Sequence, residues 1–129
     1  MLPTYLEHVP DGSSTRPFVQ YAQLHLLDNV FRKYDFGSAE DNIEHYGTAI
    51  PPAYDLSQIK VPVALFAGDK DDLACVEDVE VLAQRLPNLS LLEVVDFKGW
   101  THLDFSIGLD ADKLIYSTIL DMMQSNTQN

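Results

Sequence analysis

The sequence predicts an α/β fold built on a parallel strand–helix–strand unit. An apolar run from Val61 to Ala67 ends at Gly68, and a second run rich in leucine and valine extends from Leu89 to Phe97. Between the two runs, apolar residues at positions 79, 82, 83 and 86 recur at helical spacing. Two strands joined by a helix of this length form a parallel βαβ crossover, which buries both strands.

The N-terminal part of the chain is expected to hold one helix followed by irregular chain. Ser14 or Thr15 can cap a helix that has Pro17 in its first turn and extends to about Phe31. From 33 to 57 no period is sustained, and aromatic residues are interspersed with glycines and prolines. A structureless segment of that length is uncommon in a compact domain unless it serves as a lid or binding surface, which indicates part of a cap.

The C-terminal part is expected to alternate strands with helices. Acidic residues lie at the start of the helix between the two strands, Arg85 lies at its end, and Pro87 stops it. After the second strand, apolar residues at 114, 115, 119 and 122 predict a last helix, capped by Asp110 or Asp112.

The composition is that of a globular and strongly acidic chain. Hydrophobic residues make up 46% and charged residues 22%, outside the range of disordered chains. Eight basic and twenty acidic residues give a net charge of −12, which repels phosphate backbones and argues against a nucleic-acid partner. The single cysteine, Cys75, leaves the redox compartment open. No signal peptide or membrane span is expected in this chain, so a secreted parent would carry its signal upstream.

Two loops are expected to bring polar side chains to the same edge of the sheet. Asp69, Asp71 and Asp72 follow the first strand, and His102 follows the second. Adjacent strands lie about 5 Å apart, so a carboxylate and an imidazole on these loops can reach hydrogen-bonding distance. In such a pair the carboxylate fixes the imidazole tautomer, and the other ring nitrogen activates a hydroxyl nucleophile. Acid before histidine is also the order found in α/β hydrolases, where the serine comes first.

The acidic stretch has two other interpretations. Four of its carboxylates fall at positions 1, 3, 9 and 12 of an EF-hand loop, but Leu73 and Ala74 replace an oxygen ligand and the turn glycine. The solvated start of a helix is the stronger alternative. His102-x-Asp104 is too sparse for a metal site, so no metal and no cofactor are expected.

Short motifs extend over nearly the whole chain. They are Pro10-x-Gly-x-Ser14, Tyr21-Ala-Gln23, Phe31-Arg-x-Tyr-Asp-Phe-Gly37, Pro51-Pro-x-Tyr54, Gly68-x-x-Asp71-x-Leu73, His102-Leu-Asp-Phe105 and Gly108-Leu-Asp-Ala111. Together they resemble the acid lipase family, which includes gastric and lysosomal acid lipases. The resemblance implies that Asp71 is the triad aspartate and His102 the triad base. The family usually has glycine at the position of Asp69, so Asp69 and Asp72 stay open as alternatives for the acid.

The resemblance also implies an architecture and an activity. Residues 1–55 would complete a helical cap, and residues 56–129 would form the C-terminal portion of an α/β-hydrolase core. The parent protein would be a lipase, a serine ester hydrolase that acts on neutral lipid esters such as triacylglycerol or sterol esters. Its location would be secreted or lysosomal.

The serine nucleophile is expected outside this chain. The family's serine lies in a G-x-S-x-G elbow, and the sequence has no such motif. Gly12-Ser-Ser14 comes closest, but it lacks the final glycine and follows Pro10 rather than a strand. We therefore expect the missing N-terminal part of the fold to supply the serine and the oxyanion hole, and the chain alone to be inactive. The alternative is a truncated, inactive lipase-like protein that acts as a binding or regulatory partner.

Overall fold

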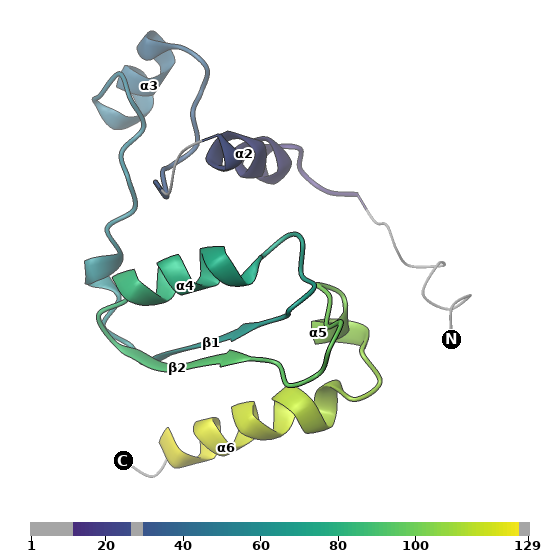
Figure 1. Ribbon diagram of the computed structural model, residues 1–129. Helices are drawn as coiled ribbons and strands as arrows, with labels where there is room; N and C mark the ends of the chain where they lie inside the picture. The colour runs from purple at the N-terminus through teal and green to yellow at the C-terminus, as the bar shows by residue number, and fades with distance from the viewer. Residues whose placement is uncertain (1–11, 27–29, 127–129) are drawn as a thin grey trace. The chain divides into compact units, whose positions relative to one another are not determined.

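The computed structural model describes residues 12–26 and 30–126, and the chain divides into two compact units (Figure 1). Unit 1 comprises Met1–Tyr54 and unit 2 comprises Asp55–Asn129. Within its described residues, unit 1 has two short helices, whereas unit 2 has a two-stranded sheet with helices around it. Unit 2 therefore contains the predicted strand–helix–strand segment.

The first helix within the described residues, α2, spans Arg16–His25 and is shorter than expected. Proline lies in its first turn as predicted, and the Ser14 hydroxyl accepts a hydrogen bond from the Arg16 N–H at 3.3 Å. The Thr15 side chain makes no capping bond. At the other end, the Leu26 N–H donates to the Gln23 carbonyl, which closes the last turn. The predicted extension to Phe31 is therefore wrong, although part of that stretch, residues 27–29, lies outside the described residues.

At residues 31–33 the chain is not helical, because it pairs with a distant segment. Residues 31–33 run antiparallel to residues 52–54, with two backbone hydrogen bonds of 2.9 and 3.0 Å. The Gln23 side chain adds two more bonds, since its amide donates to the Asp35 carbonyl at 2.8 Å and accepts from the Asp35 N–H at 3.0 Å. Long-range pairing thus overrides the local helical tendency here.

A second helix, α3 at Ala39–Tyr46, lies in the segment that was expected to be irregular. The Ser38 hydroxyl accepts from the Asp41 N–H at 3.0 Å, and Gly47 ends the helix with a φ of +75°. A serine cap at the start and a left-handed glycine at the end are both common ways to terminate a helix. The helix escaped prediction because it buries no apolar stripe: its buried residue is Asn42.

The two strands of unit 2 form the predicted parallel pair. Strand β1 is Val63–Ala67, strand β2 is Leu89–Val94, and helix α4 at Val76–Arg85 connects them. The register runs from Val63 opposite Leu89 to Ala67 opposite Val94. The second strand ends earlier than expected, because the chain turns at Val95, whose carbonyl accepts from the Phe97 N–H at 2.8 Å. The strand–helix–strand prediction is confirmed.

The remaining elements of unit 2 are helical. A 3₁₀ turn, η1 at Leu56–Gln58, precedes β1, and a short helix, α5 at Asp104–Ile107, was not expected. The last helix begins as a π-helical segment, η2 at Asp112–Tyr116, and continues as α6 at Ser117–Asn126. The prediction that Asp110 or Asp112 caps this helix is wrong. The start of the segment has no side-chain cap, and the Asp110 carboxylate instead binds the Lys113 ammonium at 2.9 Å.

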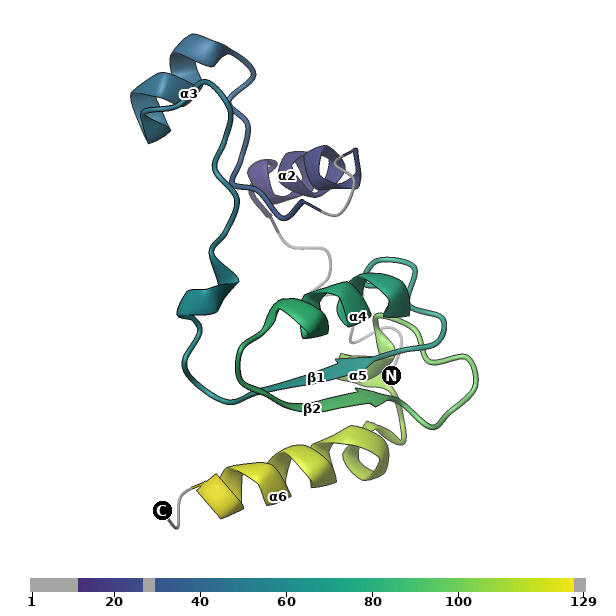
Figure 2. The ribbon, with the colours of Figure 1, turned by 60° about the vertical axis from the view of Figure 1, so that its left-hand side comes forward.

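The apolar core of unit 2 lies between its sheet and its last helix. In Figures 1 and 2, α4 lies against one face of the two strands and α6 lies on the other face. The buried cluster consists of Val95, Trp100, Ala111 and Ile115, with Phe66, Phe105, Leu114 and Ile119 packed against it. Since Val95 and Trp100 belong to the chain just after β2, the core supports the loop that carries the predicted histidine.

Candidate functional site

Asp71 and His102 form a hydrogen-bonded pair at the carboxyl edge of the sheet. Asp71 lies in the loop after β1, and His102 lies in the loop between β2 and α5; both loops leave the sheet at the same end (Figure 1). The Asp71 Oδ2 atom is 2.9 Å from His102 Nδ1. The Asp71 side chain is 4% exposed and the His102 side chain 52%. The pair therefore has a buried carboxylate and an imidazole open to an incoming group.

The other oxygen of Asp71 is held by the backbone of its own loop. Oδ1 accepts hydrogen bonds from the Leu73 N–H at 2.9 Å and the Ala74 N–H at 2.8 Å. An aspartate that accepts bonds from its own following residues makes an Asx-type turn. Because Oδ1 is fixed in this way, Oδ2 is directed at the imidazole.

These contacts keep Asp71 ionised. Burial by itself would raise the pKa of the carboxyl group, but the Ala74 N–H, the His102 imidazole and the Leu73 N–H lower it. The net result is a pKa below the ordinary 3.8. An ionised carboxylate can only accept hydrogen bonds, so Nδ1 of His102 must carry the proton. In the neutral form of the ring, Nε2 then has a free lone pair, which a general base requires.

The lowered pKa of Asp71 predicts an acid-dependent contribution to stability. A carboxyl group whose pKa is lower in the folded state stabilises the fold above the unfolded-state value of 3.8. That contribution is lost as the pH falls below 3.8 and through the folded-state pKa. We expect the difference in free energy of unfolding between wild type and Asp71→Asn to shrink as urea denaturation is repeated from pH 6 down to pH 3. A difference that stays constant over that range would contradict the prediction.

The two neighbouring aspartates occupy different environments. The Asp69 carboxylate accepts hydrogen bonds from the backbone of Gly99 and Trp100, in the loop that carries the histidine. The Asp72 residue is exposed. Among the described residues, Asp71 is the one carboxylate that the structure pairs with His102. The sequence favoured Asp71 and kept Asp69 and Asp72 as alternatives, and the contacts separate the three aspartates.

Trp100 forms the floor beneath the histidine loop. It is 3% exposed, and its ring meets Phe97 and Phe105 edge to face at 5.9 and 6.0 Å between centroids. Gly68 allows this packing, since a Cβ there would lie 2.5 Å from the Trp100 carbonyl oxygen. Within the described part of the chain, the indole Nε1 has no hydrogen-bond partner. The role of Trp100 is therefore to pack beneath the histidine loop.

The residues after His102 close its loop. The Asp104 carboxylate accepts from the Thr101 N–H at 2.8 Å and the Thr101 hydroxyl at 2.6 Å, which lowers the pKa of Asp104. Tyr116 donates its hydroxyl to the Phe105 carbonyl at 2.6 Å and ties α5 to the last helix. Hydrogen bonds therefore fix the chain just before and just after His102.

The described residues hold neither a metal-binding cluster nor a membrane-spanning helix. No group of three or more histidine, cysteine or acidic side chains in residues 12–26 and 30–126 is placed to hold a metal ion. Over the same residues, no helix is both long and apolar enough to cross a membrane. The Ser14 hydroxyl lies at the start of α2 and accepts a bond from its backbone, while the segment before Gly12 lies outside the description.

Fold and site together define the molecule as part of an α/β protein with a buried carboxylate–imidazole pair at the ends of parallel strands. No protein-family model matches the chain. It is 40% identical over 123 residues to mouse lipase member N, covering 95% of this chain and 30% of that protein. It is 35% identical over 125 residues to human gastric triacylglycerol lipase, covering 97% and 31%. With rat lysosomal acid lipase/cholesteryl ester hydrolase it shares 32% over 120 residues, covering 93% and 30%.

These relatives show that the chain belongs to the acid lipase family, which confirms the resemblance seen in its motifs. The chain spans about 30% of the length of the curated relatives it matches. Sequence reasoning missed one feature of the site, the contact between Asp69 and the histidine loop. The departure from glycine at that position was the only signal that could have indicated it.

Proposed function

We propose that this chain is the C-terminal part of a neutral-lipid ester hydrolase with the α/β-hydrolase fold, in which Asp71 is the triad acid and His102 the triad base. The observation that carries the proposal is the 2.9 Å bond between buried Asp71 and exposed His102. Its support from outside the chain is the relatives named as triacylglycerol lipase and cholesteryl ester hydrolase. Those names also support a secreted or lysosomal location.

The geometry suits a two-step acyl transfer. A serine Oγ attacks the carbonyl carbon of the ester while His102 Nε2 takes the serine proton. The tetrahedral intermediate expels the alcohol, which receives that proton from His102 as it leaves. Water then attacks the acyl-serine with His102 again as base, and the fatty acid is released as serine regains its proton. Asp71 stabilises the imidazolium formed in each step and does not itself become protonated.

The serine and the oxyanion-hole donors are assigned to the remainder of the parent fold. In the proposed architecture they belong to strands that precede this chain, in keeping with the serine–acid–histidine order of the fold. The chain and that remainder are each other's obligatory partners for hydrolysis. In isolation the chain supplies the acid and the base only.

Unit 1 fits the proposed role as part of a cap. Its fully buried described residues are Asn42 and Pro51, so it lacks an apolar core of its own. Several of its apolar side chains are open instead, with exposed fractions of 71% for Phe18, 82% for Leu26 and 65% for Ile50. Apolar surface on this scale favours a segment that contacts other protein or a lipid substrate. Residues 1–55 are therefore assigned to the cap and residues 56–129 to the core.

The test is an assay of the protein made from the complete reading frame that encodes this chain. We expect it to release fatty acid from triolein or cholesteryl oleate emulsions and to be labelled once by an alkyl phosphonate, on a serine within G-x-S-x-G. Peptide mass mapping identifies the labelled residue. Absence of both hydrolysis and labelling in a folded, monodisperse protein would instead support the inactive binding or regulatory role.

A further inference from the structure

The Asp69 side chain joins the loop of the acid to the loop of the histidine. Its Oδ1 atom accepts hydrogen bonds from the Gly99 N–H and the Trp100 N–H, each at 2.8 Å. These residues lie about thirty positions away in the chain and immediately precede Thr101 and His102. Asp69 itself lies two residues before Asp71. One carboxylate oxygen thus bridges the two loops beside the acid–histidine pair.

The backbone of the histidine loop is shaped to receive this oxygen. Gly99 has a φ of +98°, a conformation that glycine adopts without steric penalty. Successive N–H groups in such a turn converge on one point and form a small anion-binding nest. Hydrogen bonds from a nest to a carboxylate are charge-assisted and stronger than those between neutral groups. The occupant of the nest is the Asp69 side chain.

Two further contacts keep the same loops in close register. The Lys70 N–H donates to the Trp100 carbonyl at 2.9 Å. At Gly68, any Cβ would lie 2.5 Å from that same oxygen. Consecutive residues of the acid loop therefore contact the histidine loop, ending in the bond between Asp71 and His102. A shift of Trp100 relative to Gly68 would displace the imidazole from its carboxylate.

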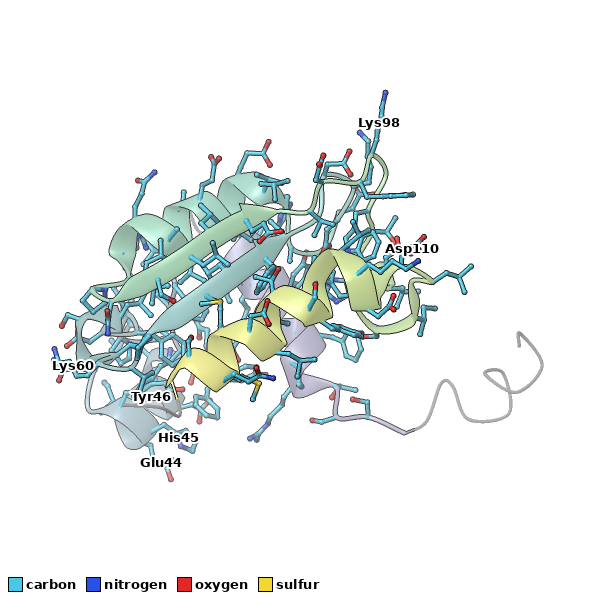
Figure 3. The ribbon with its side chains drawn as sticks, turned by 90° about the horizontal axis from the view of Figure 1, so that it is seen from below. Glu44, His45, Tyr46, Lys60, Lys98 and Asp110 are labelled. Carbon is cyan, nitrogen blue, oxygen red and sulfur yellow. The ribbon has the colours of Figure 1, made fainter. Side chains whose placement is uncertain are left out.

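The two ends of the sheet differ in how their loops are joined, and Figure 3 shows where these ends lie. Lys98, in the histidine loop, and Lys60, just before β1, are labelled at opposite ends of the two strands. At the Lys60 end, the loops are joined by neutral groups: the Asn88 amide donates to the Lys60 carbonyl at 3.0 Å. The charged bridge is placed at the end that carries the acid–histidine pair.

We propose that Asp69 is a positioning residue for the hydrolytic reaction: by binding the Gly99–Trp100 backbone it holds the His102 ring in line with Asp71. This inference rests on the proposed function. In this role Asp69 does not contact the substrate. Its effect is therefore expected in the rate of the chemical step, where misplacement of a catalytic group by about 1 Å can cost about 10²-fold.

The experiment compares Asp69→Ala with Asp69→Asn in the full-length protein, using the soluble substrate p-nitrophenyl butyrate. Asparagine keeps an Oδ1 atom that can accept from both N–H groups, whereas alanine leaves both unpaired. We expect Asp69→Ala to lower kcat roughly 10- to 100-fold with KM changed less than about twofold. Asp69→Asn should stay within about threefold of wild type, because its bonds are retained but lose their charge assistance.

Ala83→Gly is the control for a general loss of stability. Ala83 is buried in α4 near its C-terminal end, away from the strand ends that carry the pair, and glycine weakens the helix. Melting temperatures of all variants are measured in parallel. Ala83→Gly should melt earlier than wild type while keeping its kcat. The loss of kcat in each variant is compared with its fall in melting temperature. If Asp69→Ala lost no more kcat than Ala83→Gly for the same fall in melting temperature, the inference would be overturned.

A second readout does not depend on hydrolysis. In protein labelled with ¹⁵N-histidine, the Nδ1–H signal of His102 is assigned by its loss in His102→Ala. We expect the signal in wild type and Asp69→Asn, and its loss to solvent exchange in Asp69→Ala. An unchanged signal in Asp69→Ala would refute the positioning role even in a protein with no esterase activity. Failure of the proposed function is recognised separately, because the wild type would then hydrolyse no ester.

Discussion

Replacing His102 with alanine is expected to lower kcat for ester hydrolysis by about 10⁶-fold in the complete enzyme. In the proposed mechanism, the imidazole accepts the serine proton and returns it to the leaving alcohol. No other described side chain shares its bond to Asp71. Since the His102 side chain is 52% exposed, its removal creates no cavity in the core. The variant should therefore fold and bind substrate while the chemical step fails.

The measurement is fatty-acid release from triolein, with phosphonate labelling as a second signal. His25→Ala is the matched control, because His25 is an exposed histidine in the last turn of α2 and has no part in the proposed site. It should keep the wild-type rate. If His102→Ala retained more than about one part in a hundred of the wild-type kcat, His102 would not be the general base.

Changing Asp71 to asparagine is expected to lower kcat by about 10⁴-fold, although the substitution hardly alters shape. The asparagine Oδ1 can still accept from Leu73 and Ala74, which hold this loop. Its amide group, however, presents hydrogens to His102 Nδ1 in place of an accepting oxygen. The proton of the neutral ring then moves to Nε2, so the nitrogen that should accept the serine proton no longer can.

Asp72→Asn is the control for Asp71→Asn, because it makes the same chemical change one residue away at an exposed position. It should leave kcat within about twofold, since an exposed charge on this loop is largely screened by solvent. Both variants are assayed on triolein at several pH values. Full activity in Asp71→Asn together with a large loss in Asp72→Asn or Asp69→Asn would move the role of the acid to that neighbour.

The secondary structure was predicted best where apolar residues face a core. The apolar runs of β1 and β2 and the helical spacing in α4 led to the parallel pair that the structure has. Helix α3 escaped this reasoning because Asn42, its buried residue, is polar and its ends depend on capping. Helix α2 was predicted too long because its continuation pairs with residues 52–54, a contact that no local pattern reports.

The candidate site, like the secondary structure, was predictable from the sequence only in part. The proximity of Asp71 and His102 follows from sequence, because the ends of neighbouring parallel strands meet at one edge. Among the three aspartates of one loop, the family resemblance favoured Asp71 as the acid, but the roles of Asp69 and Asp72 did not follow from the sequence. The structure distinguishes them by partners: Asp71 contacts the imidazole, Asp69 contacts the Gly99–Trp100 backbone, and Asp72 faces solvent.

By itself, then, the sequence determined the strand–helix–strand order, the family and the pair of loops that carry the proposed acid and base. The strand–helix–strand order and the loops follow from periodicity and spacing, which act between residues close in the chain. The family follows from the motifs that the chain shares with acid lipases. The tertiary structure decided that neither neighbouring aspartate faces the imidazole, how Asp69 bridges the loops and where α2 ends. Each depends on hydrogen bonds between segments about twenty to thirty residues apart, whose directions arise only when the chain has folded.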